Sequence, residues 1–132
     1  MKSCLPDLSI IDITPASDSS LNIINFYSKD LITIRDQKIS TNVGVTPNTI
    51  VTFDSCAQLF EIASELNKTN QDMIFIFGGS ENYITDFMKA KSTTLDIYLE
   101  IMNLGAAVRT YNSLALDGRD VCAFFELENG KK

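Results

Sequence analysis

Seven residues, Met73-Ile74-Phe75-Ile76-Phe77-Gly78-Gly79, decide the fold of this 132-residue chain. Five consecutive apolar residues are typical of a strand that is covered on both faces, in the centre of a mostly parallel sheet. The two glycines end the strand, because glycine adopts turn conformations that other residues avoid. This segment therefore predicts an α/β fold built around one buried strand.

The residues before this strand predict a strand followed by a helix. Residues 49–53 form a short β-rich run, and Ser55 with Gln58 forms a capping box, which marks a helix start. Apolar residues then recur at helical spacing, at Cys56, Leu59, Phe60, Ala63 and Leu66. The helix is expected to end within residues 67–70. Strand, helix and strand together predict a βαβ unit.

The residues after the glycines predict a second helix and another strand. Ser80 can cap the helix, whose apolar stripe includes the pair Tyr83 and Phe87. Residues 95–101 then alternate between apolar and polar side chains, which favours a strand. A helix over residues 92–104 also satisfies the spacing, so both interpretations stay open.

The C-terminal part predicts an antiparallel β-hairpin. Asp117-Gly118 is a strong short-range signal for a hairpin turn, and it lies between the apolar runs 107–116 and 121–128. In the last run the apolar side chains alternate, so that one face holds Val121, Ala123, Phe125 and Leu127.

The N-terminal part predicts short strands and one long loop. Residues 8–14 and 31–35 favour strands, and residues 23–29 fit either a strand or a short helix. Residues 36–48 are polar and contain a glycine and a proline, which favours a loop. We therefore expect residues 1–132 to form a single α/β domain, with a mixed, mostly parallel sheet, flanking helices and a closing hairpin.

Composition limits the classes of partner and of chemistry. The net charge of −6 disfavours nucleic acid and anionic membranes as partners, since both would be repelled. Histidine is absent, which removes the usual general base and the commonest zinc ligand. Three cysteines without a CxxC pair favour reduced, buried thiols, and no signal peptide or membrane-length apolar run is present. The sequence predicts a cytoplasmic protein.

The glycine pair has two interpretations. A strand that ends in glycines before a helix start brings free backbone amides and a partial positive charge together, where a phosphate can bind. The segment Gly78-Gly79-Ser80 matches neither GxGxxG nor a Walker A loop, and the geometry of a tight turn explains two glycines equally well. A structural turn and a ligand site both stay open.

The order of these segments resembles the NADPH-binding half of dihydrofolate reductase. The match runs from Ile74-Phe75-Ile76-Phe77-Gly78-Gly79, through Tyr83 and Phe87-Met88, to Ile97-Tyr98-Leu99-Glu100-Ile101. In that family an apolar strand ends in a Gly-Gly pair, joined by a cis peptide, that lies against the cofactor. Upstream, Leu31-Ile32-Thr33-Ile34-Arg35 is similar to a strand whose arginine lies near the 2′-phosphate. The resemblance extends over residues 31–128.

This resemblance implies a truncated, dihydrofolate-reductase-like protein that binds NADP(H), a related nucleotide or another small molecule. By this resemblance the residues that contact the cofactor are Gly78, Gly79, Ser80, Tyr83 and Arg35.

The catalytic part of the resemblance is incomplete. Asp7 is the candidate for the catalytic carboxylate, but its spacing after Pro6 is one residue short of the family pattern. The family's Gly-Arg-x-Thr loop and its tryptophan are absent, which puts reductase activity in doubt. The alternative is a non-catalytic structural or protein-interaction domain of related fold, as a component of a viral or organellar assembly. Whether the chain is an enzyme stays open.

Overall fold

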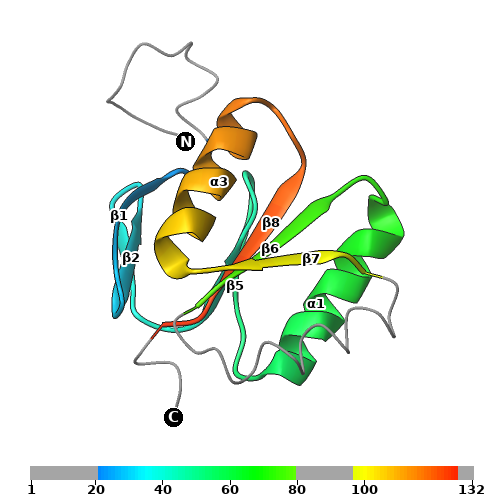
Figure 1. Ribbon diagram of the computed structural model, residues 1–132, viewed down its shortest axis with the longest axis horizontal. Helices are drawn as coiled ribbons and strands as arrows, with labels where there is room; N and C mark the ends of the chain where they lie inside the picture. The colour runs from blue at the N-terminus through cyan, green and yellow to red at the C-terminus, as the bar shows by residue number, and fades with distance from the viewer. Residues whose placement is uncertain (1–20, 80–96, 128–132) are drawn as a thin grey trace.

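A computed structural model describes residues 21–79 and 97–127 of the chain (Figure 1). Within these residues it contains eight strands and two helices. In chain order they are β1 (Ile24–Ser28), β2 (Leu31–Ile34), β3 (Gln37–Ile39), β4 (Val43–Val45), β5 (Ile50–Thr52), α1 (Cys56–Thr69), β6 (Ile74–Gly78), β7 (Leu99–Met102), α3 (Leu104–Leu116) and β8 (Val121–Phe125).

The strands form two sheets, and the predicted α/β class is confirmed. The prediction of one mostly parallel sheet is wrong, because four of the six strand pairings are antiparallel. Strands β1, β2 and β3 form a three-stranded antiparallel sheet. The second sheet has the order β5-β4-β8-β6-β7, in which β6 is parallel to both β8 and β7. Strand β4 is antiparallel to β5 and to β8. The predicted strand, helix and strand unit is β5-α1-β6, but β4 and β8 lie between its two strands.

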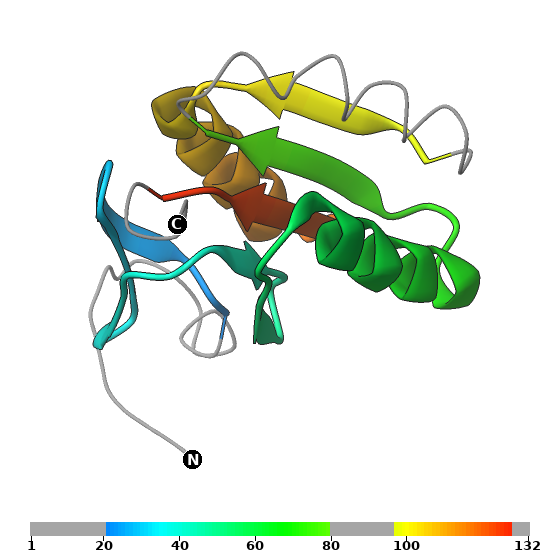
Figure 2. The ribbon, with the colours of Figure 1, turned by 90° about the horizontal axis from the view of Figure 1, so that it is seen from below.

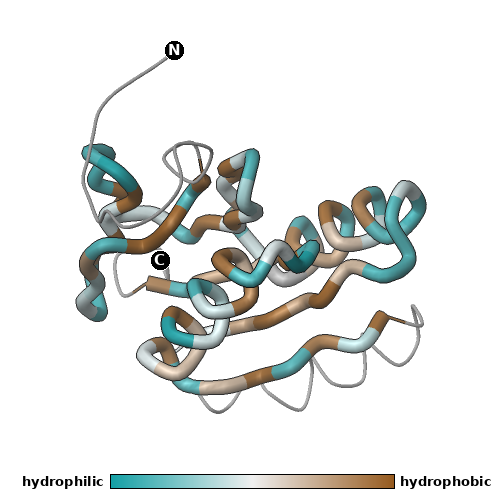
Figure 3. The backbone as a smooth tube through the Cα atoms, turned by 90° about the horizontal axis from the view of Figure 1, so that it is seen from above, coloured by the Kyte–Doolittle hydropathy of each residue, from teal (hydrophilic) through white to brown (hydrophobic). Residues whose placement is uncertain are grey.

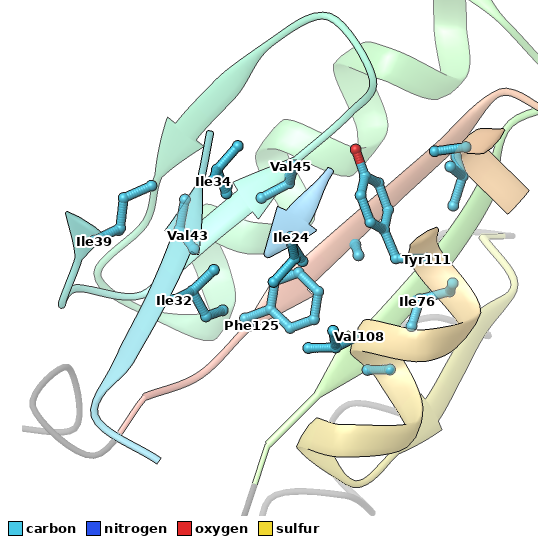
Figure 4. Close-up of a cluster of buried hydrophobic side chains, with 14 of the residues drawn as sticks. Ile24, Ile32, Ile34, Ile39, Val43, Val45, Ile76, Val108, Tyr111 and Phe125 are labelled. Carbon is cyan, nitrogen blue, oxygen red and sulfur yellow. The ribbon is translucent and has the colours of Figure 1, made fainter. Parts of the chain in front are cut away.

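Two hydrophobic layers cover the two faces of the five-stranded sheet, with α1 and α3 on opposite sides (Figure 2). In β6, Phe75 and Phe77 pack with α1, while Ile76 packs with α3 and the three-stranded sheet. Strand β6 is therefore covered on both faces, as its apolar run predicts. In Figure 3, brown segments mark hydrophobic residues in the strands of the five-stranded sheet, whereas helices α1 and α3 alternate between apolar and polar residues. Figure 4 shows Val108 and Tyr111 of α3 in the same buried cluster as Ile24 of β1 and Phe125 of β8.

The predicted C-terminal hairpin is wrong, because residues 104–116 form helix α3. Asn103 caps its start by accepting a hydrogen bond from the Ala106 amide at 2.8 Å. Gly118 has a φ of +79°, and the Arg119 amide donates to the Leu114 carbonyl at 3.0 Å. This arrangement is a Schellman motif, which ends a helix and uses the same glycine that a hairpin turn requires. Strand β8 then lies in the middle of the sheet, between β4 and β6. Its predicted apolar face is confirmed, because Val121, Ala123, Phe125 and Leu127 belong to one buried cluster.

The predicted loop over residues 36–48 is also wrong, since it contains β3 and β4. All three residues of β4 are buried. A Cβ atom on Gly44 would lie 3.0 Å from the Phe124 ring of β8, so glycine permits close packing here rather than a turn. A three-residue strand with a central glycine has too little β propensity to be recognised from the sequence.

Other expectations are confirmed where the structure describes them. Strands β2 and β5 lie within residues 31–35 and 49–53. At the two segments left open between strand and helix, β1 covers residues 24–28 and β7 covers residues 99–102. Helix α1 begins after its N-cap Ser55, whose hydroxyl accepts from the Gln58 amide at 3.2 Å. The predicted strand over residues 8–14 and the second helix lie outside the described residues.

Hydrogen bonds join α3 to the three-stranded sheet. The Asn112 side chain accepts from the Ile24 amide and donates to the Ile24 carbonyl, both at 2.9 Å, as a neighbouring strand would. The Tyr111 hydroxyl donates to the Asn22 carbonyl at 2.6 Å, in the buried interior. These bonds hold β1, an edge strand, against the helix.

Helix α3 also approaches β6 closely, at Gly78. A Cβ atom at this position would collide with the Cβ atom of Ala107, and it would lie 3.5 Å from the Leu104 backbone. Gly78 is buried, so neither neighbour can move into solvent. The first glycine of the pair is therefore required by packing between helix and strand.

We predict that Asn112→Ala destabilises the protein by about 1–3 kcal/mol, because it leaves two partly buried backbone groups of Ile24 without partners. Chemical denaturation measures the loss. Ser113→Ala, at the exposed neighbouring position, is the matched control and is expected to change stability by less than about 0.5 kcal/mol. Equal effects of the two substitutions would contradict the role of Asn112.

We predict that Gly78→Ala destabilises the protein by about 1–3 kcal/mol, because the added methyl group overlaps Ala107. In the double variant Gly78→Ala/Ala107→Gly, removal of the opposing methyl group restores space. The double variant is expected to lose less free energy of unfolding than the sum of the losses in the two single variants, by about 1 kcal/mol or more. Chemical denaturation measures all three values. Simple additivity would show that the two positions do not touch.

Candidate functional site

A pocket of about 310 Å³ lies at the carboxyl ends of the parallel strands. Among the described residues it is lined by Lys29, Gly79, Asn103, Leu104, Gly105 and Glu126. These residues come from the β1–β2 turn, the ends of β6, β7 and β8, and the start of α3. In α/β sheets, ligands bind preferentially at this edge, where strands end and helices begin.

Backbone hydrogen bonds fix the floor of the pocket. The Glu126 amide donates to the Gly78 carbonyl at 2.9 Å, and the Gly79 amide donates to the Met102 carbonyl at 3.4 Å. These bonds hold the ends of the three parallel strands together. On this side a Cβ atom on Gly79 would lie 3.1 Å from a carboxylate oxygen of Glu126, so the acidic side chain closes one wall.

The opposite wall surrounds Gly105, in the first turn of α3. A Cβ atom on Gly105 would lie 2.8 Å from the Tyr27 hydroxyl oxygen and 3.3 Å from a terminal guanidinium nitrogen of Arg109. Tyr27 and Arg109 therefore meet above the bare backbone of Gly105. Lys29, two residues after Tyr27, lines the same pocket. Within the described part of the chain, neither Lys29 nor Arg109 forms an ion pair.

The pocket thus has two walls of opposite character. Hydrogen-bond donors and two positive charges gather on the Gly105 side, and a carboxylate lies on the Gly79 side. Lys29 and Arg109 are both exposed, so solvent screens their charges and they are available to a partner.

Only part of the predicted nucleotide site can be located. Gly79 lines the pocket and Gly78 lies beneath it, whereas Ser80, Tyr83 and Asp7 lie outside the described residues. Within the described part every peptide bond is trans, including that between the two glycines, unlike the cis bond of the resemblance. Arg35 lies at the other end of β2 from Lys29 and does not line the pocket.

Arg35 is notable for its backbone. Its φ of 58° lies in the left-handed region, which costs a residue other than glycine about 1 kcal/mol or more. Its amide donates to the Asn25 side chain at 2.8 Å, which helps to hold the turn between β2 and β3. Contact of Arg35 or Gly79 with a nucleotide stays a prediction.

Two groups with potential chemical reactivity are part of the core. Burial raises the pKa of the Cys122 thiol to about 12, so it is protonated and enclosed at neutral pH. Burial also raises the pKa of Tyr111, whose hydroxyl already donates to Asn22. Across residues 21–79 and 97–127, no cluster of three His, Cys, Asp or Glu residues could hold a metal ion.

Sequence reasoning missed Tyr27, Lys29, Gly105 and Arg109. The first two lie in a segment whose secondary structure was ambiguous. Arg109 was assigned to a strand of the wrong hairpin, and Gly105 lay just before that strand, so neither was expected at a helix start. The helical spacing of Leu104, Ala107, Val108, Tyr111 and Ala115 was the available signal.

No helix among the described residues is long and apolar enough to cross a membrane.

The fold is similar to those of several solved structures. A crystal structure of a protein from Bordetella parapertussis has a TM-score of 0.65 at 19% identity, covering 86% of this chain and 100% of that one. An NMR structure from Xanthomonas campestris gives 0.64 at 21% identity, with coverages of 92% and 94%. A Bordetella pertussis protein, described as a Mth938-like domain, gives 0.56 at 16% identity, with coverages of 88% and 90%. No curated protein matches the sequence.

These comparisons overturn the resemblance to dihydrofolate reductase, and the oxidoreductase and NADP function that it implied is left without support. The resemblance rested on the order of strand, glycine pair and helix, which packing of α/β elements produces without common function. A family model described as "protein of unknown function (DUF498/DUF598)" matches residues 24–126. This match spans more than half of the sequence, and the chain therefore belongs to the DUF498/DUF598 family.

Proposed function

We propose that this protein is a non-catalytic domain that binds another protein, as a component of a larger assembly. The binding surface wraps around the free edge of β1 and extends onto the first turns of α3, and it comprises Phe26, Tyr27, Lys29, Gly105 and Arg109. We call it the β1–α3 surface.

The observation that carries this proposal is the exposure of two adjacent aromatic residues on one edge strand. Phe26 is 56% exposed and Tyr27 is 38% exposed. They pair with Thr33 and Ile32 of β2, so they project from opposite faces of the sheet and flank the strand. Exposed aromatic residues on an edge strand favour unwanted association unless they serve a partner.

The composition of the surface supports a protein partner. Tyrosine, phenylalanine and arginine are enriched in protein interfaces, where they contribute most of the binding energy. Lysine and arginine at its rim would help to orient the partner. A catalytic role for the thiol of Cys122 or the hydroxyl of Tyr111 is less favoured, because Cys122 is buried and protonated and Tyr111 forms a structural hydrogen bond.

Site-specific photocrosslinking in the native cell tests the proposal. A benzophenone amino acid is placed at Phe26, at Lys29 or, as control, at Leu116. Leu116 is 54% exposed, as apolar as Phe26, and lies at the far end of α3, about 18 Å from its start. All three positions are exposed, so each variant carries the reactive group at the protein surface.

We expect positions 26 and 29 to form the same crosslinked protein species, which position 116 does not form. Adding Tyr27→Ser to the position-29 variant is expected to reduce this species strongly, because an interface loses most of its affinity when a central aromatic is removed. Identical products at all three positions, or none at 26 and 29, would contradict a partner at the β1–α3 surface.

A further inference from the structure

We propose that the β1–α3 surface recognises an acidic segment of its partner, and that a carboxylate of this segment is held at Gly105 by Tyr27, Arg109 and Lys29. This inference rests on the proposed function, whose binding surface it uses, and specifies the chemistry of the partner.

The space above Gly105 is defined by its neighbours. The Tyr27 hydroxyl oxygen lies 2.8 Å, and an Arg109 guanidinium nitrogen 3.3 Å, from the point that a Cβ atom would occupy. Both groups therefore border one small volume, which the absence of a side chain leaves open. The pocket that Lys29 lines adjoins it.

Among the described residues, the two cationic groups beside this volume have no carboxylate partner. Neither Arg109 nor Lys29 pairs with a carboxylate within residues 21–79 and 97–127. Of the described acidic residues, Glu126 lies at the opposite wall beside Gly79, and Asp30 follows Lys29 in the β1–β2 turn. A guanidinium with a neighbouring hydroxyl matches the two oxygens of a carboxylate, which accepts bonds from both.

Charge complementarity favours an acidic protein segment over other anionic partners. The whole chain carries a net charge of −6, which repels an extended polyanion such as a nucleic acid. A single carboxylate needs only local positive charge. The Tyr27 ring beside this volume and the half-buried Leu104, which lines the pocket, suit an acidic segment that also carries apolar residues.

The test uses the full chain and an acetylated, amidated peptide of alternating Glu and Leu as the probe, with NMR titration of the Gly105 amide and the Arg109 guanidinium. A peptide of alternating Gln and Leu is the neutral control, and a short single-stranded oligothymidylate tests nucleic acid. Two variants complete the design: Arg109→Gln removes the proposed binding group, and Arg119→Gln removes another exposed arginine, beyond the other end of α3.

We expect the Glu peptide to shift Gly105 and Arg109 saturably, with an affinity at least about tenfold above that of the Gln peptide. Arg109→Gln is expected to abolish this preference, Arg119→Gln to retain it, and about 1 M salt to weaken binding strongly. Gly105→Ala, which fills the volume, should act like Arg109→Gln while leaving the fold visible in the same spectra.

Equal binding of the Glu and Gln peptides, or no shift at Gly105, would overturn the carboxylate site. Preferential binding of oligothymidylate would also overturn it, in favour of a nucleic-acid phosphate. In each case the photocrosslinks at positions 26 and 29 decide separately whether a protein partner binds the surface, so the two proposals can fail independently.

Discussion

The close approach of helix α3 to strand β6 at Gly78 is the constraint on which the rest of the structure depends. A glycine in the last position of a buried strand lets Ala107 come against the backbone. This contact sets the height of the helix above the sheet. On the same face α3 covers Ile76 of β6 and the alternating side chains of β8. The helix also connects β7, at the edge of the sheet, to β8, in its centre.

The position of α3 in turn determines the binding surface. Because Asn112 bonds to both backbone groups of Ile24, the edge strand β1 is held beside the helix, and the chain then carries Tyr27 to Gly105. Arg109 follows Gly105 by one helical turn, so it shares that face. The proposed surface is therefore a product of packing in the core, and its donors are arranged before any partner arrives, which lowers the entropic cost of binding.

Local sequence patterns predicted elements better than their arrangement. The apolar run of β6 and the Ser55 cap of α1 were recognised because strand burial and helix capping leave signals within a few residues. Strand order was not predictable in this way, since the entry of β8 between β4 and β6 depends on contacts far apart in sequence. Helix α3 was mistaken for a strand because Gly118 serves a helix end and a hairpin equally well. The glycine pair was correctly singled out, but its first member serves close packing, and most of the proposed surface lay in segments that were ambiguous or wrongly assigned.

The docking of β1 on the start of α3 is the central claim, and nuclear Overhauser contacts in the free protein measure it most directly. We expect strong contacts between the ring protons of Tyr27 and the α-protons of Gly105, since a Cβ atom on Gly105 would lie 3.5 Å from the Tyr27 ring. A Tyr27 ring that shows contacts within β1 and β2 but none to Gly105 would contradict it, because the donors would then not meet at one place.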